Sequence, residues 1–180
     1  MSGPPSMRLI GAAAAVALVV FAAGCGSSKN AATTTTSSTV DWANGVCSAV
    51  STYQASLTAA AKSLTGNLSK AGLQDAANQA KKATDTFVST TKGLGKPDTD
   101  SGKQAKATLD TLSSQLDADA SAVKSASESS LLTGISTASA TLVTAQKQIT
   151  TAFDQLKALD PKGELGDAFS QASSCSSLTG

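Results

Sequence analysis

Larger apolar residues recur every three or four positions along most of this 180-residue chain, the spacing that places them on one face of an α-helix. Four long runs of this kind follow residue 40, and no stretch alternates apolar and polar residues as a half-buried strand does. The runs cover residues 42–64, 73–91, 105–123 and 135–156. The pattern therefore predicts an all-α domain.

The segments between the runs contain residues typical of helix ends. Residues 93–97, GLGKP, follow the second run, and Asp160-Pro161 follows the fourth. Thr39 or Asp41 is available to cap the first helix, and Asp100 or Ser101 the third. Because these connections are short, neighbouring helices run antiparallel, and we expect an up-down four-helix bundle.

A fifth, shorter run closes the chain and predicts a short C-terminal helix packed across the bundle. Its apolar positions are Leu165, Ala168, Phe169, Ala172 and Cys175.

Trp42 and Tyr53 are three helical turns apart and fall on nearly the same face of the first helix. When exposed, such a pair can stack on a ligand or a partner. Their place in the apolar run favours the core instead.

The first 24 residues have a different pattern, typical of an export signal. Arg8 is the only charge before a continuous apolar stretch from Leu9 to Ala23. That stretch suits the hydrophobic region of a signal peptide and is shorter than the ~20 residues that cross a bilayer as a helix. Residues 1–24 are predicted to be a signal peptide, with its start at Met1 or Met7.

The apolar stretch ends in Ala22-Ala23-Gly24-Cys25, which resembles the lipobox of bacterial lipoproteins. The resemblance implies cleavage after Gly24 and a diacylglycerol, with acyl chains such as palmitate, on the thiol of Cys25. Two acyl chains hold a protein stably on a membrane. The chain is then a lipoprotein on the extracytoplasmic face of the cell membrane. The alternative is a soluble secreted protein in which Cys25 has no such role.

Residues 26–39, GSSKNAATTTTSST, contain no large apolar residue and are predicted to be an extended tether. The threonines can accept O-linked sugar, although such segments are more often plain spacers. The predicted organisation is a signal peptide (1–24), a lipidated Ser/Thr-rich tether (25–39) and a helical bundle domain (40–180).

Two cysteines remain for the bundle once Cys25 carries lipid. Because an exported chain passes through an oxidising compartment, Cys47 and Cys175 are predicted to form one disulfide. The bond would tie the last helix to the first. A reactive or metal-binding pair is the rival interpretation, which the chain supports with neither a CxxC motif nor a histidine.

The whole layout resembles the small helical lipoproteins and secreted proteins of high-GC Gram-positive bacteria. The resemblance rests on the lipobox, the tether, an opening Trp42-x4-Cys47 and a closing Leu165-x3-Phe169-x5-Cys175. It implies this architecture and no particular activity.

Charge and composition narrow the possible functions. The chain has 14 Lys and Arg against 13 Asp and Glu, and no histidine. A neutral chain lacks the basic surface that binds nucleic acid, and without histidine it lacks the usual neutral-pH base and the commonest metal ligand. No nucleic acid, metal or cofactor is expected.

Candidate catalytic and metal motifs are incomplete. Ser69-Lys70 does not have the spacing of a Ser-x-x-Lys hydrolase site. Asp98, Asp100 and Gly102 resemble the opening of a calcium loop, but Leu109 stands where the loop needs its bidentate glutamate. A capped interhelical turn fits them better. We also expect Asp117 and Asp119 to be surface charges.

The sequence therefore predicts a lipid-anchored cell-envelope protein without catalytic residues, acting as a binding or interaction module through envelope contacts. The alternative is a carrier or sensor of a small apolar ligand held between the helices. A sizeable pocket between the helices would favour the carrier, and a filled core would favour the interaction module. A hydrolase is the third and weakest interpretation.

Overall fold

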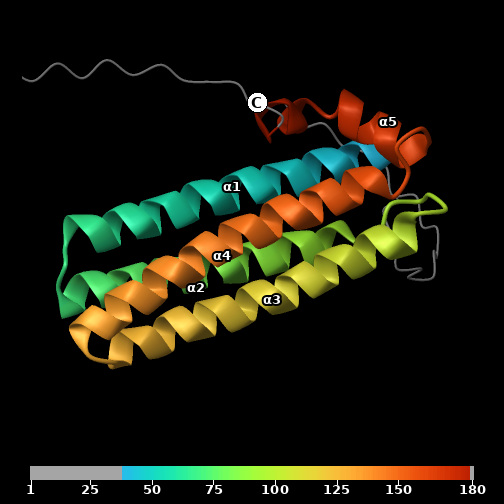
Figure 1. Ribbon diagram of the computed structural model, residues 1–180. Coiled ribbons are helices and arrows are strands. Elements are labelled where there is room, and N and C mark those ends of the chain that lie inside the picture. Colours follow the sequence, from blue (N-terminus) through green and yellow to red (C-terminus); the bar gives the residue numbers. More distant parts are fainter. Residues whose placement is uncertain (1–37, 179–180) are drawn as a thin grey trace, which may run out of the picture. The chain divides into compact units, whose positions relative to one another are not determined.

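The structure is a computed structural model that describes residues 38–178, and nearly all of these residues are helical (Figure 1). No strand occurs in this range. The helices are α1 (Thr39–Gly66), α2 (Lys70–Leu94), α3 (Gly102–Glu128), α4 (Leu131–Ala158), α5 (Glu164–Gln171) and the 3-10 helix η1 (Ser173–Leu178). The all-α class, with four long helices and a short fifth one, is confirmed.

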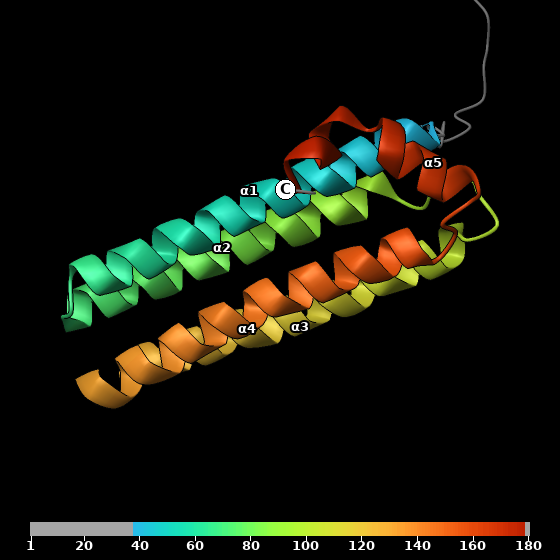
Figure 2. The same ribbon diagram turned by 45° about the horizontal axis from the view of Figure 1, so that its top comes forward.

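The four long helices run up and down and pack as two antiparallel hairpins. α1 packs along α2, α3 packs along α4, and α2 joins the two hairpins through α3. Figure 2 shows α1 and α2 as one layer and α3 and α4 as the other. The predicted up-down bundle is therefore confirmed.

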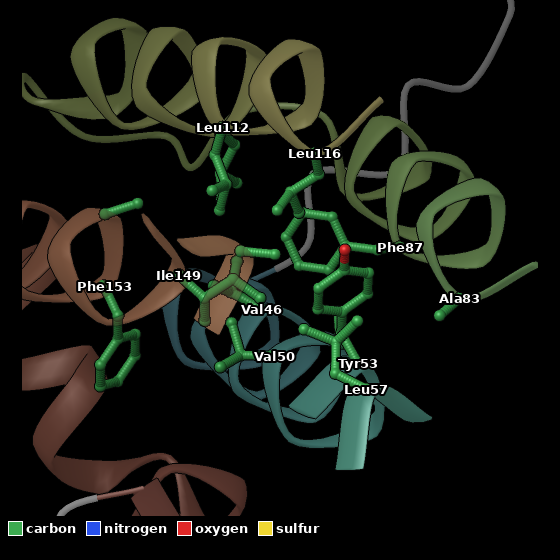
Figure 3. Close-up of a cluster of buried hydrophobic side chains, with 14 of the residues drawn as sticks. Val46, Val50, Tyr53, Leu57, Ala83, Phe87, Leu112, Leu116, Ile149 and Phe153 are labelled. Carbon is green, nitrogen blue, oxygen red and sulfur yellow. The ribbon is translucent and has the colours of Figure 1, made fainter. Parts of the chain in front are cut away.

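The core lies between these two layers and is built from all four helices (Figure 3). Val46 and Val50 of α1 lie near Ile149 of α4. Leu112 and Leu116 of α3, in the same layer as α4, point toward this cluster. Many remaining core positions are alanines, which allow helices to pack closely and bury little apolar area each. The core is consequently narrow and tightly filled.

Trp42 and Tyr53 are both buried, as their place in the apolar run predicted. The indole Nε1 of Trp42 donates a hydrogen bond of 3.3 Å to the carbonyl oxygen of Gly95. Gly95 follows the last residue of α2 with a φ of 66°, a conformation that glycine adopts without steric cost. The turn after α2 is thus fastened to the first turn of α1.

The first helix is capped differently from the expectation. Ser38, and not Thr39 or Asp41, is the N-cap, and its hydroxyl accepts a hydrogen bond of 3.1 Å from the backbone N–H of Asp41. The same hydroxyl donates to the Asp41 carboxylate at 2.7 Å. Asp41 lies in the first turn of α1, where its negative charge interacts favourably with the helix dipole.

The last apolar run does not form one helix. α5 ends at Gln171, the backbone is extended at Ala172, and Cys175 lies on η1. The side-chain oxygen of Asn44 accepts a hydrogen bond of 3.0 Å from the backbone N–H of Ser174. This contact with α1 turns the chain away from the axis of α5.

The predicted signal peptide, Cys25 and the tether up to residue 37 lie outside the described residues.

Candidate functional site

Cys47 and Cys175 form the predicted disulfide. Their Cα atoms lie 5.0 Å apart, and both residues are buried. Cys47 faces inward from α1, and Cys175 is brought to it by η1. The bond connects two segments separated by 128 positions in the sequence.

Three aromatic rings close the same end of the bundle. Phe169 of α5 contacts Trp42 edge to face at a ring-centroid distance of 6.0 Å, and Phe153 of α4 at 5.7 Å. The ammonium group of Lys157 lies 5.5 Å from the centroid of the Phe153 ring. Offset and edge-to-face pairs of this kind stabilise a core beyond their buried area. The end carrying the disulfide is therefore held by both a covalent bond and aromatic packing.

A polar cluster lies in the middle of the bundle. Tyr53 and Thr84 share a buried hydrogen bond of 3.2 Å between their hydroxyl oxygens, and the Tyr53 ring packs on Phe87 at a centroid distance of 5.4 Å (Figure 3). Burial raises the pKa of Tyr53, the Thr84 hydrogen bond opposes that rise, and the charge of Asp119 adds to it. Tyr53 is a neutral donor or acceptor at physiological pH.

Asp119 belongs to this cluster, contrary to the expectation of a surface charge. Asp117 is exposed, but Asp119 is half-buried, and its Oδ2 is buried with no hydrogen-bond partner among the described residues. Burial raises the pKa of the Asp119 carboxyl, against a hydrogen bond from Gln148 that lowers it. Two positions along a helix separate these aspartates by about 200°, and only the structure decides which of them faces inward.

All four long helices line one small hollow at this cluster. Its volume is about 10 Å³, and its lining includes Tyr53, Thr84, Asp119 and Thr141. That space holds about one water molecule.

Charge is distributed unequally over the long helices. α2 carries six charged residues and α3 seven, whereas α1 carries two and α4 three. Residues 42–61 of α1 and 131–146 of α4 contain none. On α2 and α3, Lys81 pairs with Asp85 at 2.8 Å and Lys106 with Asp110 at 2.6 Å. These exposed pairs contribute little to the free energy of unfolding. Their main effect is to make the surface of α2 and α3 more highly charged than that of α1 and α4.

Surface grooves follow the helix pairs. The groove between α1 and α2 has a volume of about 460 Å³, with Tyr53 and Phe87 among its lining residues. The groove between α3 and α4 measures about 640 Å³ and is lined mainly by threonine, glutamine and alanine. Hydroxyl and amide groups both donate and accept hydrogen bonds, so the α3–α4 groove can contact polar groups of a partner as well as apolar ones.

Four large apolar residues are exposed among the described residues. Leu68 is 62% exposed in the turn between α1 and α2, and Leu131 and Leu132 are 39% and 83% exposed at the start of α4. These turns lie at the end of the bundle opposite α5 (Figure 1). Val143, 50% exposed, lies farther along α4. The sequence analysis missed these positions because they share the apolar character of core residues.

The candidate chemical motifs have structural roles. Gly102 donates a backbone hydrogen bond of 2.9 Å to Thr99 in the turn before α3, and Asp98 and Asp100 are exposed there. Ser69 is the N-cap of α2, where its hydroxyl accepts from the backbone N–H of Gly72 at 3.2 Å.

Two Ser-x-x-Lys spacings that the sequence analysis missed, Ser89 to Lys92 on α2 and Ser121 to Lys124 on α3, have all four residues exposed. Residues 38–178 contain no group of three or more side chains placed to bind a metal ion. None of the helices in this range is both long and apolar enough to cross a membrane.

Comparison with protein-family models, with curated proteins and with solved structures found no match to this chain.

Proposed function

We propose that this protein is exported, is anchored by lipid on Cys25 to the outer face of the cell membrane, and acts there as a non-enzymatic interaction module. The observation that carries the proposal is the Cys47–Cys175 disulfide. Disulfides persist in oxidising compartments outside the cytosol, so the bond supports export. The membrane anchor rests on the lipobox resemblance of Ala22-Ala23-Gly24-Cys25.

The surface of the bundle supports an interaction role. α4 presents exposed Leu132 and Val143 on a segment without charges, and the α3–α4 groove is lined mainly by threonine, glutamine and alanine. Pockets that enclose small ligands measure ~300 Å³ or more, whereas the hollow at the centre of this bundle measures about 10 Å³, and the larger hollows of about 460 and 640 Å³ are grooves at the surface. A carrier of an apolar ligand would have to open the core, and binding on the outer surface requires no such rearrangement.

Intact mass spectrometry of the protein from the membrane fraction of its host tests the proposal. We expect a chain that begins at Cys25, carries the mass of a diacylglycerol, and exposes two alkylatable thiols only after reduction. Cys25→Ala is the matched variant, and it should lose the lipid and leave the membrane fraction.

Two results would contradict separate parts of the proposal. A wild-type chain without lipid would remove the membrane anchor. Thiols of Cys47 and Cys175 that react without reduction would remove the support for export.

A further inference from the structure

The outward side of α4 carries two of the four exposed large apolar residues among residues 38–178. We call Leu132, Ser136, Ser139, Val143 and Lys147 the outer α4 face; all five are exposed. Leu132 and Val143 are eleven positions apart, three helical turns, so their side chains project from the same side of α4. Exposed apolar residues gathered on one helix face are typical of a contact surface.

The outer α4 face is complementary to itself when a second copy lies antiparallel to it. With a twofold axis crossing between residues 137 and 138, Leu132 faces Val143 of the second copy, and Ser136 faces its Ser139. Each contact then occurs twice, as in an isologous dimer. The small serine side chains near the axis let the two helices approach closely, while the apolar residues cover each other on both sides.

The same axis pairs opposite charges. Lys147 is the first charged residue on α4, and the symmetry brings it toward the α3–α4 turn of the second copy, where Glu128 is exposed. Within residues 38–178, neither Lys147 nor Glu128 belongs to an ion pair. Because the symmetry brings Lys147 and Glu128 together at both ends of the contact, the charges favour a second copy of this chain over an unrelated protein.

We propose that the outer α4 face is a self-association surface on which two copies dock antiparallel. The proposal supplies the partner for the interaction module proposed above, and it does not require the lipid. The contact spans residues 131–147, about 24 Å along one helix face. We therefore expect its buried area to be at the small end of specific interfaces. The dimer is therefore weak in solution, and anchoring on one membrane strengthens it by raising the effective concentration.

Sedimentation of the chain from residue 25 onward, with Cys25→Ser to remove the lipid and the extra thiol, tests the proposal. Between about 10 µM and about 1 mM, we expect a concentration-dependent change from monomer to dimer. Lys147→Glu should weaken the dimer about tenfold, because the substitution places two negative charges together at both ends. Glu128→Lys combined with Lys147→Glu should restore it. Lys62→Glu, an exposed charge reversal on α1, is the matched control.

Cross-linking tests the geometry of the dimer. Ser139→Cys lies next to the proposed axis and should join two copies with a short bis-maleimide reagent. Ser121→Cys, exposed on α3, should not. Far-UV circular dichroism of every variant confirms that the bundle is folded.

A chain that stays monomeric over the whole concentration range would overturn the self-association surface. So would a dimer that is insensitive to Lys147→Glu, a double reversal that fails to restore association, or equal cross-linking through Ser121→Cys. These results do not depend on the lipid, so failure of the anchor and failure of the dimer are separately visible.

Discussion

The two ends of the bundle are closed by different kinds of interaction. At the end where α1 begins, the disulfide and the contacts of Phe169 with Trp42 and Phe153 hold α5 and η1 on the bundle. At the opposite end, the turns after α1 and α3 are short, and Leu68 and Leu132 project into solvent. Among residues 38–178, the disulfide and the aromatic contacts therefore hold one end of the bundle, while the opposite end exposes large apolar side chains to solvent.

Removing the disulfide is the strongest test of the fastened end. Cys47→Ala together with Cys175→Ala should lower the free energy of unfolding by about 2 to 5 kcal/mol, because the unfolded chain regains the freedom of a loop spanning 128 positions. Denaturant unfolding measures the loss, and hydrogen exchange should locate it in α5 and η1. Ser48→Ala, beside Cys47 and exposed, is the control. Unchanged protection of α5 and η1 would show that packing alone holds them.

Removing the aromatic contacts should have the next largest effect. Phe169→Ala leaves a cavity between Trp42 and Phe153 and should cost about 3 kcal/mol or more. Thermal unfolding measures the cost, and amide exchange in α5 should become faster than in α2. Phe87→Ala in the middle of the bundle is the comparison, with a similar global cost and no selective release of α5. If both variants release α5 equally, the aromatic cluster has no special role at this end.

At the opposite end, close packing depends on Gly134. A Cβ atom there would lie 2.5 Å from the carbonyl oxygen of Ala126 and 2.6 Å from Cδ2 of Leu73. Gly134→Val should therefore lower the unfolding free energy by about 1 to 3 kcal/mol, measured with urea. Gly66→Ala is the matched control, since a Cβ at Gly66 meets nothing within 4 Å. Equal stability of the Gly134→Val and wild-type chains would contradict this close approach.

Between the two ends, Asp119 should reduce stability at neutral pH. Its pKa is raised by burial in the folded state, so its contribution to stability is greatest below its ordinary value of 3.8 and is lost as pH rises through the folded-state pKa. Asp119→Asn should slightly raise the melting temperature at pH 7 and flatten the pH dependence above pH 3.8. Asp117→Asn, exposed on the same helix, should change neither. A lower melting temperature of Asp119→Asn at pH 7 would mean that the hydrogen bond from Gln148 outweighs the cost of burying the carboxylate.

The smallest effect on stability is expected at Leu132, the most exposed of the leucines at the end of the bundle opposite α5. Leu132→Ser should change the unfolding free energy by less than about 0.5 kcal/mol, since the side chain is 83% exposed, and yet weaken self-association. Chemical denaturation and sedimentation of the same sample separate the two effects. A marked loss of stability would place Leu132 in the monomer core instead.

Two of the positions where the sequence analysis differed from the structure share a cause. The apolar spacing continued through Ala172 to Cys175, but the hydrogen bond from Ser174 to Asn44 and the disulfide draw this segment onto α1. Asp119 resembled any other charged residue on a helix. In each case the deciding contact comes from a residue distant in the sequence, which local spacing does not register.

The helices, their approximate ends, the up-down bundle and the pairing of Cys47 with Cys175 were all predictable from the amino-acid sequence. Apolar periodicity, short connections and a single possible pair of bundle cysteines are local or countable properties. Only the tertiary structure decided that Asp119 faces the interior, that the bundle centre leaves space for about one water molecule, and that Leu132 and Val143 remain outside. These features depend on how helices rotate and pack against one another, because the same apolar residue is core or contact surface according to what covers it.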